Sequence, residues 1–376
     1  MAENRNDKRQ PDRILILVTL LLLAIGLLMV FSASYVVAEE EVGDPYHFLK
    51  RQALWTAIGL GAMYLFSRIN YRKLKKLSLL ILLVNFILLA LIFTGLGSEL
   101  GTEARRWLTI GPVVLQPSEF SKLAFVIFIA AYMSTKRMNV RNLWVSTVVP
   151  FALVGMAFLM IQFQPDLGTA LVVLAAAALV VIFAGMPVSR LAGLSLLALL
   201  PLAYLTVKEE YRMQRLFTFI NPWADPSESG YQIIQSFYAL GSGHLFGVGL
   251  GRSKQKLFYL PEPQNDFIFA VIGEELGFIG GVAILLLYLI LIWRGFQIAY
   301  KAPDLFGSLL AAGIIFTFAL QVLLNVAVVT GMLPVTGINL PLISYGGSSV
   351  LFVLCSIGIL LNISKYTRDL PAKQRS

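Results

Sequence analysis

Ten stretches of mostly apolar residues follow one another along the chain, and they are the feature that most restricts its fold. A helix of about 17 to 25 residues is long enough to cross a hydrocarbon core of roughly 30 Å. Each stretch must be helical, because an unpaired strand edge in lipid leaves backbone hydrogen-bonding groups unsatisfied. The pattern predicts an all-α polytopic membrane protein with ten transmembrane helices. The predicted spans are Ile14–Ala38, Gln52–Ser67, Leu77–Leu96, Ser118–Ser134, Leu143–Ile161, Gly168–Ala184, Leu191–Val207, Phe267–Trp293, Gly307–Thr330 and Ser348–Ile363.

Composition agrees with this class and excludes several others. Hydrophobic residues make up 57% of the 376 residues and charged residues only 14%, which does not fit a soluble protein. The net charge of +9 is spread over short segments between apolar runs, which argues against a nucleic-acid binder. The one cysteine, Cys355, excludes an intrachain disulfide, and the two histidines, His47 and His244, stand in different loops, which argues against a histidine metal site.

The distribution of positive charge predicts the orientation in the membrane. Alternate connections hold most of the 30 lysines and arginines, and such connections face the cytoplasm. We therefore expect cytoplasmic tails at residues 1–13 and 365–376, with a ten-helix membrane domain at residues 14–364. The first apolar run follows a basic stretch, as in a signal peptide, but its length of about 25 residues predicts a retained helix.

Two connections on the opposite side of the membrane are long, and long ordered loops usually carry function. One is Gly97–Pro117, and the other is a large extracytoplasmic loop at residues 208–265, between the seventh and eighth helices. Within it, Tyr231–Leu240 is expected to form a helix lying in the membrane interface. The glycines of Gly241–Gly251 follow no strand, so they do not form a dinucleotide-binding fingerprint, and an irregular loop over the outer mouth is the better interpretation.

Charged residues at helix ends in a bilayer are expensive and therefore mark candidate sites. Asp266 begins the eighth predicted helix, directly after the large loop. It could simply complement the helix dipole. Partial dehydration beside an apolar helix favours proton uptake, however, whereas the helix N-terminus favours the ionised form, and these opposed effects suit a general base.

Four other charged residues are predicted at the same membrane depth as Asp266. Glu119 and Lys122 are spaced i,i+3 at the start of the fourth helix, and an ion pair is the simplest interpretation. Arg51 and Asp166 stand at the outer ends of other helices, where each alone would be an interfacial anchor. Because several connections contribute charge at one depth, we expect them to form one site.

Further polar groups surround this predicted site. Arg105 and Arg106, with basic residues of the large loop such as Arg215 and Lys256, form a cationic collar that contacts lipid head groups or, alternatively, clamps a substrate phosphate. Glu274 and Glu275 are interpreted mainly as buried groups that hydrogen-bond between helices. No ATP exists outside the cell, so a synthetic reaction there needs a substrate with its own leaving group, such as a lipid diphosphate. A transporter remains a competing interpretation.

Several long ordered motifs resemble the SEDS family (shape, elongation, division and sporulation), whose members include FtsW, RodA and SpoVE, and the FtsW/SpoVE branch is the most similar. The resemblance covers the whole ten-helix core. The matching motifs are Arg105–Trp107, Gln116–Lys122, Gln164–Thr169, Asn221–Trp223, Pro261–Phe269, Glu274–Gly277, Pro334–Gly337 and Ser344–Ser349.

This resemblance implies a peptidoglycan glycosyltransferase that polymerises lipid II on the outer face of the bacterial cytoplasmic membrane. It implies partners among the proteins of division, elongation or sporulation, with a class B penicillin-binding protein as the direct partner. It implies no binding of nucleic acid. It also implies that Asp266 is the catalytic residue and that Arg51, Glu119, Lys122 and Asp166 line the substrate cavity. A divalent cation, Mg or Mn, is a possible cofactor. A lipid II flippase and a non-catalytic scaffold for the penicillin-binding protein are the alternatives.

Overall fold

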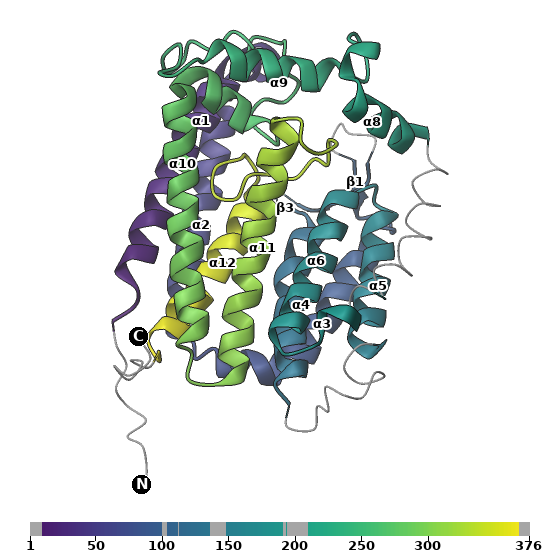
Figure 1. The fold of residues 1–376 in the computed structure, drawn as a ribbon, viewed down its shortest axis with the longest axis vertical. Helices are drawn as coiled ribbons and strands as arrows, with labels where there is room; N and C mark the ends of the chain where they lie inside the picture. The colour runs from purple at the N-terminus through teal and green to yellow at the C-terminus, as the bar shows by residue number, and fades with distance from the viewer. Residues whose placement is uncertain are drawn as a thin grey trace.

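A computed structural model describes residues 10–99, 104–111, 113–135, 148–190, 193 and 210–367. These residues form a bundle of long helices with shorter helices across one end (Figure 1). The bundle helices are α1 (Arg13–Val42), α2 (His47–Arg68), α3 (Arg72–Leu91), α4 (Pro117–Met133), α5 (Val149–Gln162), α6 (Leu167–Phe183), α10 (Ile268–Tyr300), α11 (Leu305–Val329) and α12 (Gly347–Ser364). The others are α8 (Glu210–Ile220), α9 (Tyr231–Ser242) and the 3₁₀ turn η2 (Pro222–Ala224).

The bundle helices coincide with the predicted spans, apart from their ends. Among the described residues, α1, α3, α10, α11 and α12 are long and apolar enough to cross a bilayer, and α5 and α6 are shorter apolar helices. The seventh predicted span, Leu191–Val207, lies outside the described residues except for Gly193. The membrane class is thus confirmed, whereas the count of ten spans stays a prediction.

The connection between α3 and α4 differs from the all-α prediction. It forms a small antiparallel sheet in the order β1-β2-β3, from β1 (Gly97–Ser98), β2 (Trp107–Ile110) and β3 (Val113–Leu115). Leu108 pairs with Leu115 and Ile110 with Val113, so the chain turns at Gly111, whose φ is +59°. β-branched residues on either side of a glycine turn favour this hairpin. Strands this short show too little alternation to be recognised in the sequence.

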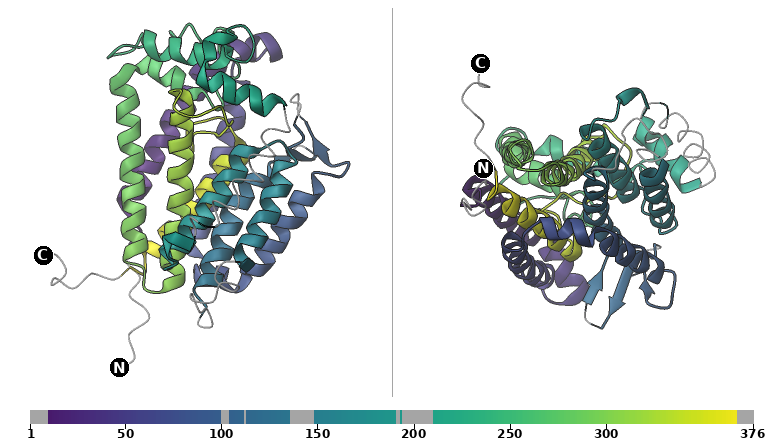
Figure 2. Two further views of the ribbon diagram at one scale, coloured as in Figure 1. Left: turned by 45° about the vertical axis from the view of Figure 1, so that its right-hand side comes forward. Right: turned by 90° about the horizontal axis from the view of Figure 1, so that it is seen from below.

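The described ends of the chain meet at one end of the bundle. The Asp12 amide, before α1, donates to the Ser364 hydroxyl, at the end of α12, over 3.1 Å. The helices α8 and α9 lie across the opposite end, and the turned views show the sheet at the edge of the bundle (Figure 2). The described residues next to the two termini are therefore on the same side, as the predicted topology requires.

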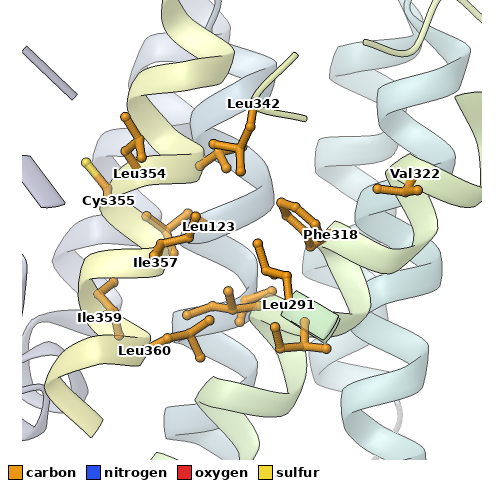
Figure 3. Close-up of a cluster of buried hydrophobic side chains, with 14 of the residues drawn as sticks. Leu123, Leu291, Phe318, Val322, Leu342, Leu354, Cys355, Ile357, Ile359 and Leu360 are labelled. Atoms are coloured by element: carbon orange, nitrogen blue, oxygen red, sulfur yellow. The ribbon is translucent and has the colours of Figure 1, made fainter. Parts of the chain in front are cut away.

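The core is apolar and is built by several helices at once. Leu123 of α4, Leu291 of α10, Phe318 of α11 and Ile357 and Leu360 of α12 lie close to one another (Figure 3). Other apolar side chains point outward, as expected for surfaces that face lipid tails. In α2 and α3 such residues include Leu54, which is 61% exposed, and Leu79, which is 69% exposed.

Helix α10 is interrupted at Gly277, where φ is +68° and ψ is −171°. At this break the backbone groups of α10 pair with residues 244–249 instead of with each other. The bonds run from Val248 N to Glu274 O (2.9 Å), from Gly249 N to Glu275 O (3.1 Å), from Phe278 N to His244 O (2.9 Å) and from Ile279 N to Leu245 O (3.1 Å). We call Ile268–Leu276 the first half-helix. The inserted segment satisfies the four groups that the break frees, as a broken membrane helix requires.

Candidate functional site

Asp266 stands two residues before the first half-helix, and its main chain is held by other elements. The Asn325 side-chain amide, from α11, donates to both the Asp266 carbonyl and the Ile338 carbonyl, each over 2.7 Å. The next residues, Phe267 and Ile268, are fully buried. Asp266 itself is partly exposed. Its backbone is therefore fixed, while its carboxylate keeps access to a substrate.

The segment before Asp266 is tied to α2 and to the start of α12. The Tyr345 amide donates to the Gln264 carbonyl over 2.9 Å. The buried Gln52 side chain of α2 donates to the Ser344 carbonyl and accepts from the Gly346 amide, each over 3.1 Å. These bonds join three distant parts of the sequence around the Asp266 segment.

The surroundings of Asp266 change the affinity of its carboxylate for a proton. Burial is the largest influence on the pKa of Asp266 and, with the negative charge of Glu262, raises it; the net pKa is about 6. The positive charges of Arg215 and Arg106 lower the pKa, as does a hydrogen bond from the backbone. The carboxylate is therefore mostly ionised at neutral pH yet binds a proton far more readily than an ordinary aspartate, which suits a general base.

The two arginines that act on Asp266 come from different loops. Arg215 belongs to α8, where its guanidinium donates to the Val335 carbonyl over 3.1 Å. The sequence analysis groups Asp266 with Arg51 and Lys122 and places Arg215 only in the cationic collar, without connecting it to Asp266. The arginine on a short amphipathic helix was the available signal, but the sequence does not show where that helix lies.

Arg106 and Arg105 make well-defined contacts with main-chain oxygens. The Arg106 guanidinium donates to the Gln164 carbonyl over 3.2 Å and to the Pro165 carbonyl over 2.6 Å. Arg105 is exposed and donates to the Gly97 carbonyl over 3.1 Å. Arg106 thus orders the turn before α6 and also contributes positive charge near Asp266.

Glu119 and Lys122 form the predicted ion pair. The Lys122 Nζ lies 2.7 Å from Glu119 Oε1, and each side chain is only 7% exposed. Glu119 Oε2 has no hydrogen-bond partner among the described atoms. Both residues line a cavity of about 30 Å³ inside the bundle, together with Thr317 and Gln321 of α11. This volume is enough for a water molecule.

Asp166 is the N-cap of α6 and is buried. Its carboxylate accepts from the Thr169 amide over 3.1 Å, the Ser118 hydroxyl over 3.1 Å and the Gln116 side-chain amide over 3.3 Å. Because Ser118 and Gln116 stand at the start of α4, Asp166 connects the N-termini of α4 and α6. It therefore shapes the end of the bundle where Glu119 begins its helix.

Arg51 is exposed, and its guanidinium hydrogen-bonds the Tyr345 hydroxyl. Burial raises the pKa of Tyr345, and the charge of Arg51 opposes this rise. Arg51 is thereby attached to the residue whose amide holds Gln264. It is linked to the Asp266 segment through Tyr345.

Lys256, expected in the exposed cationic collar, is instead buried. Its Nζ lies 2.7 Å from Glu275 Oε1, and the two side chains are 1% and 0% exposed. The expectation that Lys256 contacts lipid head groups or a substrate phosphate is therefore wrong. A buried acid two turns into the next helix supplies the partner that such a lysine requires. The interpretation of Glu274 and Glu275 as buried groups is confirmed; Glu275 hydrogen-bonds Ser32 of another helix, α1, whereas Glu274 hydrogen-bonds the large loop.

The described residues contain no group of three or more histidine, cysteine, aspartate or glutamate side chains placed to hold a metal ion. The donor set that Mg²⁺ or Mn²⁺ prefers is thus not assembled by these residues alone. The divalent cation stays a prediction, and no chemical step is assigned to it.

Comparison with known proteins finds similarity to one family along nearly the whole chain. Residues 12–369 match the family model FTSW_RODA_SPOVE, described as a cell cycle protein. The chain is 46% identical to Stage V sporulation protein E of Bacillus subtilis (strain 168), covering 96% of this chain and 99% of the relative. It is 42% identical to the probable peptidoglycan glycosyltransferase FtsW of Geobacter sp. (strain M18), covering 95% and 97%.

Solved structures give the same assignment. One, described as structural coordination of polymerization and crosslinking by a peptidoglycan synthase complex, is 31% identical with a TM-score of 0.76, covering 94% of this chain and 97% of that one. The rod shape determining protein RodA of Thermus thermophilus is 30% identical with a TM-score of 0.70, covering 96% and 98%. The protein described here belongs to the FtsW/RodA/SpoVE family of cell cycle proteins.

Proposed function

We propose that this chain is a peptidoglycan glycosyltransferase that polymerises lipid II into glycan strands on the outer face of the bacterial cytoplasmic membrane. Relatives about 40% identical over nearly their full length are named probable peptidoglycan glycosyltransferases. The single structural observation that carries the proposal is Asp266, a partly exposed carboxylate with a pKa of about 6. It stands at the end of a buried half-helix and near two arginines.

Asp266 is the general base in this proposal. The 4-hydroxyl of the acceptor GlcNAc attacks C1 of the donor MurNAc, the C1–O bond to undecaprenyl diphosphate breaks, and the anomeric centre inverts from α to β. Asp266 takes the hydroxyl proton as the new glycosidic bond forms. General base catalysis of this kind typically contributes 10²–10⁴-fold to the rate.

The cations of the site hold the diphosphate as its charge develops. Arg106 supplies positive charge on the sheet side of Asp266, and Arg215 supplies it from α8. Arg51 and Lys122 are the further diphosphate ligands that we propose, with Arg105 at the rim. Fixed positive charge in a poorly hydrated site stabilises a developing anion more strongly than water does.

The two buried acids have structural parts in the same proposal. Glu119 orients Lys122 through their 2.7 Å contact. Asp166 holds the N-termini of α4 and α6 together. In this proposal both shape the substrate site, and neither takes a proton from the sugar.

A single base is sufficient because the leaving group is a diphosphate. Glycosidases generally need a second carboxylic acid to protonate a poor sugar leaving group, whereas a diphosphate leaves without a proton. A lone poised carboxylate beside cations therefore favours glycan synthesis over hydrolysis.

The partner that we propose is a class B penicillin-binding protein, which would cross-link the strands made here. A structural neighbour belongs to a peptidoglycan synthase complex that coordinates polymerization and crosslinking. We also propose that both tails are cytoplasmic and that the large loop and Asp266 are extracytoplasmic. The chain would then serve division, elongation or sporulation.

The test is polymerisation of labelled lipid II by the purified protein, with its penicillin-binding partner, in liposomes. Polymer is expected from the unaltered chain and none from Asp266→Asn, provided that the variant is folded. Equal polymer from both would remove Asp266 from the mechanism. Movement of lipid II across the bilayer without any polymer would favour the flippase.

A further inference from the structure

Five buried polar residues around the break in α10 have no part in the proposed chemistry. We call them the buried carboxylate cluster, and they join α1, the large loop and the first half-helix. The cluster consists of Ser32, Ser253, Lys256, Glu274 and Glu275.

Glu275 is the centre of the cluster. Its carboxylate lies 2.7 Å from Lys256 Nζ and accepts from the Ser32 hydroxyl at 2.8 Å and 2.6 Å on its two oxygens. Lys256 also donates to the Ser32 hydroxyl over 3.1 Å and lies over the ring of Tyr35, 4.9 Å from its centroid. Because neither side chain has solvent access, removal of one partner would leave the other as an uncompensated buried charge.

The Glu274 carboxylate binds main-chain groups of the large loop. Its carboxylate accepts from the Lys254 amide over 2.9 Å, the Gln255 amide over 3.3 Å and the Ser253 hydroxyl. The neighbouring backbone is packed just as closely, because a Cβ on Gly243 or Gly247 would overlap main-chain atoms of α10. The loop and the end of the first half-helix therefore form one rigid unit.

The cluster and Asp266 stand at opposite ends of the first half-helix. Seven helical steps separate Ile268 from Glu275, a length of about 10 Å at 1.5 Å per residue, and Asp266 stands two residues before Ile268. A tilt of about 5° at the cluster would therefore move Asp266 by about 1 Å. Displacements of about 1 Å in a catalytic group can cost roughly 10²-fold in rate.

We propose that Lys256, Glu275 and Ser32 are positioning residues that fix the angle of the first half-helix at its far end, while Asn325 holds the Asp266 carbonyl at the near end, and that both are needed to place the Asp266 carboxylate in polymerisation. They touch neither substrate nor reacting atoms. This inference depends on the proposed function, in which Asp266 is the base.

The test compares Lys256→Met with Lys254→Met in the full chain with its partner in liposomes. Lys254 is exposed and contributes its amide to the cluster, which methionine retains. We expect Lys256→Met to lower kcat about 10²-fold, with KM for lipid II little changed, and Lys254→Met to match the unaltered chain. Equal kcat in both folded variants would overturn the proposal.

The pH dependence of the polymerisation rate distinguishes a positioning role from a purely structural role, because a purely structural role would leave it unchanged. A displaced Asp266 is less dehydrated, so its pKa falls toward the ordinary value and the acid limb of the profile moves to lower pH. Glu262, Arg215 and Arg106 are the charged groups that act on this carboxylate, and Lys256→Met leaves them in place. An unchanged acid limb together with reduced kcat would contradict the displacement.

A second pair of variants covers the case in which Lys256→Met does not fold. Ser32→Ala removes the hydroxyl bonded to Glu275, whereas Ser34→Ala removes another buried hydroxyl on the same helix, which is bonded to the Val30 carbonyl. We expect Ser32→Ala to lower kcat about tenfold and Ser34→Ala to leave it unchanged. Equal rates for the two would reject the positioning role.

Hydrogen–deuterium exchange separates failure of this inference from failure of the proposed function. If the unaltered chain makes no polymer, the proposed function fails, but exchange can still be compared. Faster exchange at residues 266–276 in Lys256→Met, and not in Lys254→Met, would support control of the half-helix by the cluster. Equal exchange in both would refute it.

Discussion

Polymerisation should slow on acidification in proportion to the loss of the Asp266 carboxylate. A general base acts only in its ionised form, so the rate should rise with pH through the pKa of Asp266, which burial raises to about 6, and then level off. With this pKa, about 90% of the carboxylate is ionised at pH 7 and about 10% at pH 5. The rate at pH 5 should therefore be about a tenth of the plateau.

The charges near Asp266 allow the assignment of this titration to be tested. Glu262→Gln removes a negative charge that raises the pKa of Asp266, so the acid limb should move to lower pH. Arg215→Gln removes a positive charge that lowers the pKa, so the limb should move to higher pH. The two opposite shifts distinguish Asp266 from another group with a similar midpoint.

The measurement is the initial rate of lipid II polymerisation in liposomes from pH 4.5 to 8.5 at constant ionic strength. The penicillin-binding partner is held at saturation so that pH-dependent assembly does not enter. A midpoint near 4, a flat profile, or shifts in the same direction for both variants would refute the assignment of Asp266 as a partly dehydrated base.

Three further predictions concern stability, measured by thermal unfolding in detergent. Because the pKa of Asp266 is raised in the folded state, the free energy of unfolding should fall as pH rises from about 4 to about 6. Asp266→Asn should therefore be more stable than the unaltered chain by up to about 3 kcal/mol at pH 7. An unchanged stability would contradict the dehydration of Asp266. Glu119→Gln alone should lower the free energy of unfolding by about 3 to 5 kcal/mol, because it leaves Lys122 buried without a counter-charge. Adding Lys122→Met should recover much of this stability, since a matched neutral pair is tolerated. Additive losses from the two substitutions would argue against the pair. Gly277→Ala should prevent stable folding because its φ is +68° and the added Cβ would overlap the Gly247 amide. Gly61→Ala, inside α2 with open space around the Cβ, should instead stabilise the chain by about 0.5 to 1 kcal/mol.

The sequence predicted the helical membrane class and the buried pair because both depend on local spacing. Apolar runs require helices in lipid, and the i,i+3 spacing of Glu119 and Lys122 places them on one face. Asp266 was likewise identified by its place at the start of an apolar helix. Helix ends were less certain, and α10 continues to Tyr300, beyond the predicted Trp293.

What the sequence could not reveal depends on contacts between distant segments. The insertion of residues 244–249 into α10 is a pairing of main-chain groups, and main-chain groups leave no trace in side-chain periodicity. Lys256 was misjudged for the same reason, since its partner Glu275 lies on the next helix. The influence of Arg215 on Asp266 likewise depends on where α8 lies.

The Asn325 and Tyr345 contacts can form only late in the synthesis of the chain. Both residues follow Asp266 in the sequence, yet they hold the Asp266 and Gln264 carbonyls. During synthesis, Asp266 emerges from the ribosome well before either residue exists. The site is therefore completed only when the chain has been made as far as Tyr345, and a chain that stops before residue 325 has Asp266 but neither contact that holds its segment.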